Sequence, residues 1–102
     1  MEIPADGSSL RSLGFSNGPV TAFSVPREVV VSTRVDQPTG VTAVFTQPAA
    51  TEVADYLVRT LPKTGFVVTS QAPAAASLTF TGYGWTGSFT GTGDSSAVVL
   101  KP

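Results

Sequence analysis

One amphipathic helix that runs directly into a strand is the feature that most limits the fold of this chain. Apolar side chains recur at Val53, Leu57 and Leu61, which is the i, i+4, i+8 spacing of a single helix face. Pro48 suits the first turn of such a helix, and Glu52 places an acidic side chain near its positive end. The pattern predicts one helix whose apolar stripe packs against a sheet.

The helix is predicted to end in the pentapeptide Leu61-Pro62-Lys63-Thr64-Gly65. Its proline disfavours helical backbone at the preceding residue, its glycine can adopt positive φ, and a strand pattern begins at once with Phe66. The same letters match L-P-x-T-G, the signal at which sortases cut exported proteins between Thr and Gly. A sorting signal is followed by a membrane-spanning segment and a basic tip, whereas residues 66 to 102 show a strand pattern. We therefore interpret the pentapeptide as a tight joint between helix and strand.

Most of the remaining chain alternates in the manner of β-strands. Residues 85 to 90, for example, alternate Trp, Gly and Phe with Thr, Ser and Thr, which is typical of a half-buried strand with a threonine-rich solvent face. Strands are predicted over residues 28 to 35, 41 to 46, 66 to 69, 77 to 81, 85 to 90 and 95 to 101. The order β-β-α-β-β-β-β predicts an α+β fold, in which one helix packs on one face of a mostly antiparallel sheet of five to six strands.

The first 25 residues differ from the rest, because glycine, proline and serine dominate them and apolar anchors are few. We expect residues 1 to 25 to be a loosely ordered leader, with one short strand over residues 20 to 25. Residues 26 to 102 are expected to form a single domain. The total length of 102 residues suits one domain with one modest core.

Composition excludes several classes of chemistry. The chain contains no Cys and no His, which removes disulfides, thiolate metal sites, and the commonest general base and metal ligand. Charged residues make up 13% of the chain and its net charge is −1, so nucleic acid and acidic membrane surfaces are poor candidate partners. No apolar run approaches the roughly 18 to 20 residues that span a bilayer. We expect no metal, no cofactor and no membrane insertion by this chain.

Residues 82 to 87 read G-Y-G-W-T-G and match G-x-G-x-x-G, a glycine pattern of nucleotide-binding sites. In a dinucleotide site the pattern opens a helix, whereas here it runs into a strand. The catalytic loop and metal-binding Asp of a kinase cannot be fitted into the residues that follow. We therefore interpret these glycines as turn and bulge residues of an antiparallel sheet.

The carboxylates are scattered over turns, helix and leader. Glycosidase-type catalysis needs two of them to converge in a cleft, and Asp36, Asp55 and Asp94 are the candidates. Asp36 and Asp94 could be neighbours at sheet turns. Asp94 with Ser95 and Ser96 could also offer oxygens to calcium, although the density of Asp and Asn typical of a calcium site is absent. By default, we interpret these residues as turn and surface residues.

Tyr83, Trp85 and Phe89 share one parity, so a continuous strand would set them in a row on one face. Such a row is most often core beneath a helix, but an exposed Tyr-Trp pair can mark a ligand or partner surface. Tyr83 and Trp85 are therefore the candidate partner surface. No catalytic, cofactor-binding or metal-binding residue is predicted.

A resemblance rests on the run Thr-Glu-Val-Ala-Asp-Tyr-Leu from residue 51, which leads into Leu-Pro-Lys-Thr-Gly-Phe, and on the later Ser-Leu-Thr-Phe from residue 77. Over roughly residues 28 to 100 the chain resembles a group of small exported actinobacterial proteins of lipoprotein type. Tyr56-Leu57 stands where an aromatic followed by Tyr is commoner, and Phe66 where Trp is commoner. The lipobox cysteine of that group does not occur in these residues, which leaves lipid anchoring open. The resemblance implies export and an α+β fold, and it transfers no catalytic residue.

Together, these observations predict a non-enzymatic, extracellular or cell-envelope domain that binds another envelope protein or a surface ligand through its sheet or its helix-free face. It is expected to be a monomer or a weak dimer. Two alternatives stay open: a small carboxylate-dependent hydrolase or transferase, and a structural domain of a larger secreted protein. A concave pocket that holds two of the three candidate carboxylates would favour the hydrolase.

Overall fold

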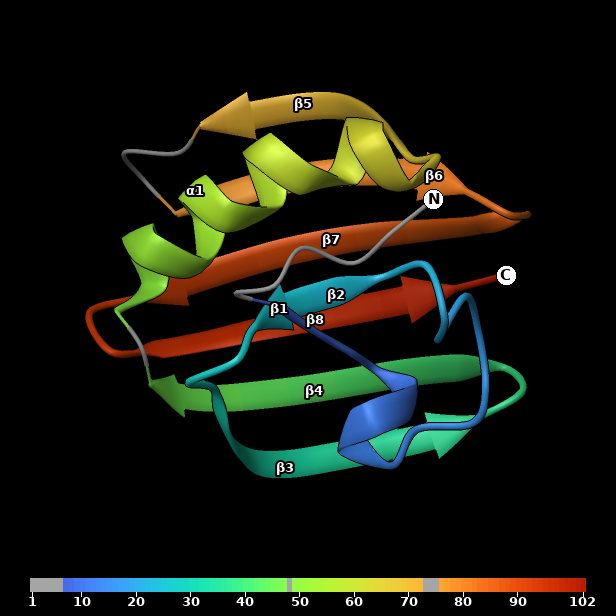
Figure 1. Ribbon diagram of the computed structural model, residues 1–102, viewed down its shortest axis with the longest axis horizontal. Helices are drawn as coiled ribbons and strands as arrows, with labels where there is room; N and C mark the ends of the chain where they lie inside the picture. The colour runs from blue at the N-terminus through green and yellow to red at the C-terminus, as the bar shows by residue number, and fades with distance from the viewer. Residues whose placement is uncertain (1–6, 48, 73–75) are drawn as a thin grey trace.

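Six antiparallel strands form the sheet that carries the fold (Figure 1). The computed structural model describes residues 7–47, 49–72 and 76–102. In sheet order the strands are β3 (Val30–Gln37), β4 (Gly40–Gln47), β8 (Ser95–Lys101), β7 (Trp85–Thr92), β6 (Ser77–Gly82) and β5 (Val67–Ala72). The helix α1 (Ala50–Thr60) lies between β4 and β5 in the sequence. The predicted α+β class, the six antiparallel strands and the single α-helix are therefore confirmed.

α1 packs on one face of the sheet and buries the predicted stripe (Figure 1). Val53 and Leu57 are fully buried, whereas Asp55 on the outer side is exposed. No side chain caps the first turn of the helix. Instead, the backbone N–H of Ala50 donates to the carbonyl of Gly93, in the turn between β7 and β8, at 2.7 Å. The sheet thus supplies the acceptor that an N-cap side chain usually provides.

The Leu-Pro-Lys-Thr-Gly pentapeptide forms the predicted joint. Leu61–Thr64 make one turn of 3-10 helix, η2, and Gly65 follows in the left-handed region with φ +99° and ψ +10°. Thr64 is buried, and its backbone carbonyl accepts a hydrogen bond from the Tyr83 hydroxyl at 2.6 Å. The peptide bond between Thr64 and Gly65 therefore lies inside a folded turn.

Residues 7 to 26 form an ordered part of the covering layer, which differs from the loosely ordered leader expected from their composition. β1 (Gly7–Ser9) pairs antiparallel with β2 (Ser24–Pro26), and a turn of 3-10 helix, η1 (Arg11–Leu13), follows β1. β2 overlaps the strand expected over residues 20 to 25 only at its end. Residues 1–6 lie outside the described part of the chain.

Tertiary contacts explain this order. Leu10 and Phe23 are fully buried, and the side chain of Phe15 is nearly so. A hydrogen bond of 2.8 Å joins the buried hydroxyls of Ser24 in β2 and Tyr56 in α1. The N-terminal segment is therefore held by contacts with the core and the helix as well as by its own β1–β2 pairing.

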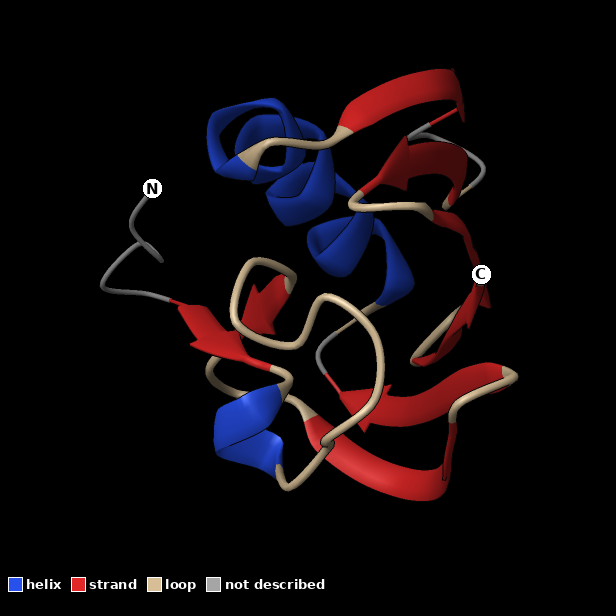
Figure 2. Cartoon of the chain, turned by 90° about the vertical axis from the view of Figure 1, so that its right-hand side faces the viewer, coloured by secondary structure: helices blue, strands red, loops and turns tan. Residues whose placement is uncertain are grey.

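The core lies between the sheet and a covering layer made of α1 and residues 7 to 26 (Figure 2). α1 covers the part of the sheet with β6 and β7, and the N-terminal segment covers the part with β4 and β8 (Figure 1). Phe23 stacks on Phe80 of β6 with ring centroids 5.3 Å apart and meets Phe66 edge-on at 5.9 Å. These rings join the N-terminal segment, the helix-to-strand joint and the sheet in one core.

Candidate functional site

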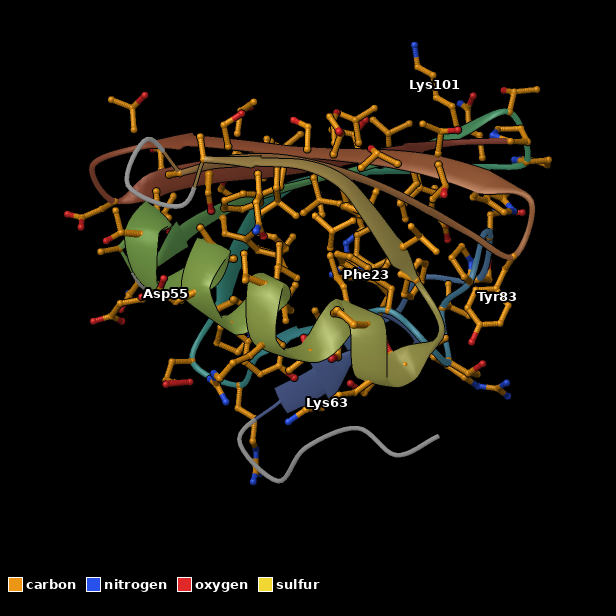
Figure 3. The ribbon with its side chains drawn as sticks, turned by 90° about the horizontal axis from the view of Figure 1, so that it is seen from above. Phe23, Asp55, Lys63, Tyr83 and Lys101 are labelled. Carbon is orange, nitrogen blue, oxygen red and sulfur yellow. The ribbon has the colours of Figure 1, made fainter. Side chains whose placement is uncertain are left out.

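The face of the six-stranded sheet that points away from α1 is covered by no element of the described chain (Figure 3). Lys101 projects from this face, whereas Phe23 lies between the layers (Figure 3). Outward side chains alternate with buried ones along the four inner strands: in β4, Thr42 and Val44 are partly exposed beside buried Ala43. We call this surface the open face. By strand parity and register it includes Thr33, Val35, Thr42, Val44, Val67, Thr69, Ser77, Thr79, Thr81, Thr86, Ser88, Thr90, Ala97, Val99 and Lys101.

The strand register sets the open face in ranks that cross the sheet. In the central rank, Val35 pairs with Thr42, Thr42 with Val99, Val99 with Ser88, and Ser88 with Thr79. Directly opposed side chains on neighbouring strands have Cβ atoms about 4.5 to 5.5 Å apart, so members of a rank touch. The rank therefore forms a continuous strip over five of the six strands.

Hydroxyl and small aliphatic groups make up nearly all of the open face. Every Thr and Ser hydroxyl is both a donor and an acceptor of hydrogen bonds. The hydroxyls of Thr69 on β5 and Thr79 on β6 already bond each other across the strands at 2.7 Å. Such a surface can bind groups that both donate and accept, and it can bury methyl groups beside them.

Lys101 is the single ionisable side chain among the open-face residues. The ionisable residues of β3 point to the other side of the sheet, because Arg34 pairs with buried Ala43 and Asp36 with buried Val41. On that side the Arg34 guanidinium lies 5.1 Å from the centre of the Phe15 ring. The open face is therefore nearly uncharged, although its rim and the covering layer carry charges.

Two shallow hollows lie along the central strands of this face. One of about 250 Å³ is lined by Val44, Thr90 and Ala97, and by residues at the end of β7 and the start of β8. The other, of about 290 Å³, is lined by Thr79, Thr86, Gly87, Ser88, Val99 and Lys101. Neither hollow contains a carboxylate among these residues. Their chemistry suits contact with another surface better than it suits acid–base catalysis.

Asp36, one of the candidate carboxylates, makes a structural contact. Its oxygens accept hydrogen bonds from the backbone N–H and the side chain of both Ser16 and Asn17, at 2.9 to 3.1 Å. Burial raises the pKa of the Asp36 carboxyl, but the four hydrogen bonds outweigh this effect, so its pKa lies below the ordinary value. Asp36 therefore ties the N-terminal segment to the end of β3.

Asp94 lies in the β7–β8 turn, next to the residue whose carbonyl caps α1. With Thr46, Gln47 and Ala49 it lines a polar hollow of about 500 Å³ at the start of the helix. A carboxylate near a helix N-terminus is stabilised by the positive end of the helix dipole. Asp94 is therefore a turn residue at the start of the helix.

The three candidate carboxylates do not form the pair that a glycosidase-type site requires. Asp36 is in register with the end of β8 at Leu100, whereas Asp94 precedes the first residue of that strand, which separates them by roughly 20 Å along the sheet. Asp55 projects to solvent from the outer side of α1 (Figure 3). The hollow beside Asp94 has no second carboxylate among its described lining residues.

Tyr83 and Trp85, the candidate partner surface, both contact the covering layer. Tyr83 lies in the turn between β6 and β7. Its ring packs edge-on against the Phe66 ring, with centroids 5.2 Å apart, and its hydroxyl donates to the backbone carbonyl of Thr64. Trp85 is half-buried against the core, at the place where Gly18 passes over its ring. Tyr83 is 48% exposed at the end of the sheet, so a role in binding stays a prediction for it.

The glycines of the G-x-G-x-x-G match have structural causes. A Cβ added to Gly87 would clash with carbons of the Phe80 ring, and one added to Gly82 would lie 2.5 Å from a carbon of the Phe66 ring and would clash as well. Gly84 has φ +79° in the β6–β7 turn. The pattern thus follows from close packing and a tight turn, and it opens no helix.

Within residues 7–47, 49–72 and 76–102, no three side chains of His, Cys, Asp or Glu gather in a way that could hold a metal ion. The helices in this part of the chain are also too short and too polar to cross a membrane. No protein-family model, curated protein or solved structure matches the chain. The candidate site is therefore defined by its geometry and chemistry alone.

The sequence signal for the open face was visible in only one strand. Residues 85 to 90 predicted a threonine-rich solvent face, and Thr86 and Thr90 are exposed as expected. The ranks contributed by β4, β6 and β8 depend on the strand order, which places strands adjacent that are distant in the sequence. A search for Thr and Ser at alternate positions in several strands would have identified many of the outward hydroxyl residues, but not the ranks that they form across the sheet.

Proposed function

We propose that the chain is a non-enzymatic, exported binding domain of the cell envelope, and that it binds through the open face. The observation that carries this proposal is a face of six strands that no described element covers, with hydroxyl and small aliphatic side chains and a single charge. A sheet that packs helices on one side normally leaves its second side to solvent or to a partner. The near absence of charge favours a partner.

Export is supported by the resemblance to exported actinobacterial proteins and by a composition rich in Thr, Ser, Ala, Val and Gly and poor in Lys and Glu. Fractionation of the source bacterium with an antibody against this chain tests it. Recovery with the envelope or the medium is expected, and recovery with the cytoplasm would contradict the proposal. A signal peptide with a lipobox cysteine encoded upstream would add a lipid anchor.

A site-specific crosslinking experiment tests the binding surface. Because the chain contains no Cys, a photoreactive group can be attached at one chosen position, such as Ser88→Cys on the central rank. Asp55→Cys on the exposed side of α1 is the matched control. After illumination with the envelope fraction, adducts of defined mass are expected from position 88 and not from position 55. Equal labelling at both positions, or none, would refute the assignment of the open face.

A further inference from the structure

The chemistry of the open face matches itself, and we infer that its partner is a second copy of this chain, packed face to face so that two sheets form a β-sandwich. This inference rests on the proposed function, because it names the partner of the same face. Four properties of the open face support it: hydrogen-bonding capacity, charge, area and the position of Lys101.

Self-complementarity follows from the side chains of the open face. A surface of carboxylates or of amines repels its own copy, whereas a hydroxyl can donate to or accept from another hydroxyl. The contact between Thr69 and Thr79 shows this pairing within one sheet. Val44, Ala97 and Val99 lie among the hydroxyls on the neighbouring strands β4 and β8, where a second sheet would shield them from water. Apart from Lys101, two identical faces therefore offer each hydroxyl and aliphatic group a suitable neighbour.

The area is sufficient for a small dimer interface. Six strands of six to eight residues, spaced about 4.8 Å apart with a rise of about 3.3 Å per residue, make a face of roughly 600 Å². Two such faces bury roughly 1,200 Å² in total, which is the lower end of the range for specific interfaces. Sheets that pack in this way lie about 10 Å apart with a strand angle of about 30°. The expected dimer is therefore weak and depends on concentration.

Lys101 decides the orientation of the second copy. It is the last residue of β8, one of the two strands at the middle of the sheet. If the two-fold axis between the facing sheets runs along the strands, the two Lys101 side chains lie at the same end of the sandwich and close together near its middle. Their like charges then repel. If the axis instead runs across the strands, along the central rank, the two Lys101 side chains lie at opposite ends of the sandwich. That axis brings Val99 close to Val99 of the second copy.

Sedimentation velocity over about 5 to 500 µM tests the association, a range that covers weak dimers. We expect the sedimentation coefficient to rise from that of a monomer toward that of a dimer. Ser88→Lys puts a charge at the centre of the interface and should weaken the dimer at least about 10-fold. Thr51→Lys adds the same charge on the exposed side of α1 and should have no effect. If Ser88→Lys fails to fold, Thr90→Lys on the same face replaces it.

Single cysteines locate the interface, since the chain has none of its own. Val99→Cys is expected to form a disulfide-linked dimer under mild oxidation. Asp55→Cys on α1 and Gln71→Cys on the edge strand β5 should stay monomeric under the same conditions. Linkage through Gln71→Cys would reveal pairing of sheet edges and would overturn the inference.

A monomer at every concentration, or a dimer that Ser88→Lys leaves intact, would also overturn it. These failures are distinguishable from failure of the proposed function. If the chain is a monomer and position 88 crosslinks to another envelope component, the open face remains the binding surface, but its partner is not a second copy of the chain. A monomer that gives no adduct at position 88 refutes both.

Discussion

Replacement of Gly65 by alanine should destabilise the protein by about 1 kcal/mol. Gly65 ends η2 with φ +99°, and its backbone N–H donates to the carbonyl of Leu61. Left-handed backbone costs an L-residue roughly 1 to 2 kcal/mol. Alanine also has less conformational freedom than glycine in the unfolded chain, and this stabilises the folded state by about 0.4 to 1 kcal/mol, which offsets part of the strain. Since Gly65 is exposed, the strain of the backbone dominates the result.

Two further variants test whether the loss of stability comes from the positive φ of Gly65. Asn tolerates left-handed backbone better than Ala does, so Gly65→Asn should lose less stability than Gly65→Ala. Gly40 does not have positive φ, and a Cβ there would make only ordinary contact with the Leu100 carbonyl. Gly40→Ala should therefore change stability by less than about 0.5 kcal/mol.

Urea denaturation followed by the fluorescence of the single tryptophan, Trp85, measures all three variants. A loss of 1 kcal/mol corresponds to a decrease of about 4 to 8 °C in Tm for a domain of this size. The reasoning would be refuted if Gly65→Ala were neutral, or if Gly65→Asn were the more damaging of the two substitutions at this position.

Three further predictions concern the helix, the joint and the N-terminal segment. Leu57→Ala should cost roughly 2 to 4 kcal/mol in chemical denaturation because it leaves a cavity in the core. Exposed Asp55→Ala should cost less than about 0.5 kcal/mol, and the reverse order would mean that the helix face is misassigned. A sortase supplied with a glycine nucleophile should leave the bond between Thr64 and Gly65 intact in the folded protein, as checked by mass; efficient cleavage would show an accessible, extended segment. Because the pKa of Asp36 is lowered in the folded state, its ionised carboxylate stabilises the fold. This contribution is present at pH values above the ordinary carboxyl pKa of about 3.9 and is lost as the pH falls through the folded-state pKa. Thermal melts should therefore show a steeper loss of stability below about pH 4 in the wild type than in Asp36→Asn; parallel pH profiles would argue against this contact.

The local part of the fold was predictable because each signal lies within a few residues. The stripe of Val53 and Leu57 predicted the buried face of α1, and Gly65 ends the helical path as expected. Pro62 does not end it, because Leu61 keeps right-handed helical backbone and the chain continues as 3-10 helix to Thr64. Alternation along residues 85 to 90 identified both faces of β7. These signals depend on backbone geometry that neighbouring residues impose on one another.

The N-terminal segment could not be predicted in this way. Leu10, Phe15 and Phe23 are spaced without a helical or strand period, and each finds its partners in distant parts of the chain. The contact of Asp36 with Ser16 and Asn17 also joins residues far apart in sequence. The open face had a similar obstacle, because its ranks exist only once the strand order is known.

The capping of α1 by the Gly93 carbonyl has a consequence for folding. Formation of the first helical turn is the unfavourable step in helix formation, and here one of the N–H groups that a first turn leaves unpaired, that of Ala50, finds its acceptor in a hairpin more than forty residues later in the sequence. An isolated peptide of these residues should therefore be largely unfolded in water. In the intact protein, the amide hydrogens of α1 should exchange together with those of β7 and β8, because the helix and the hairpin can open only as one cooperative unit.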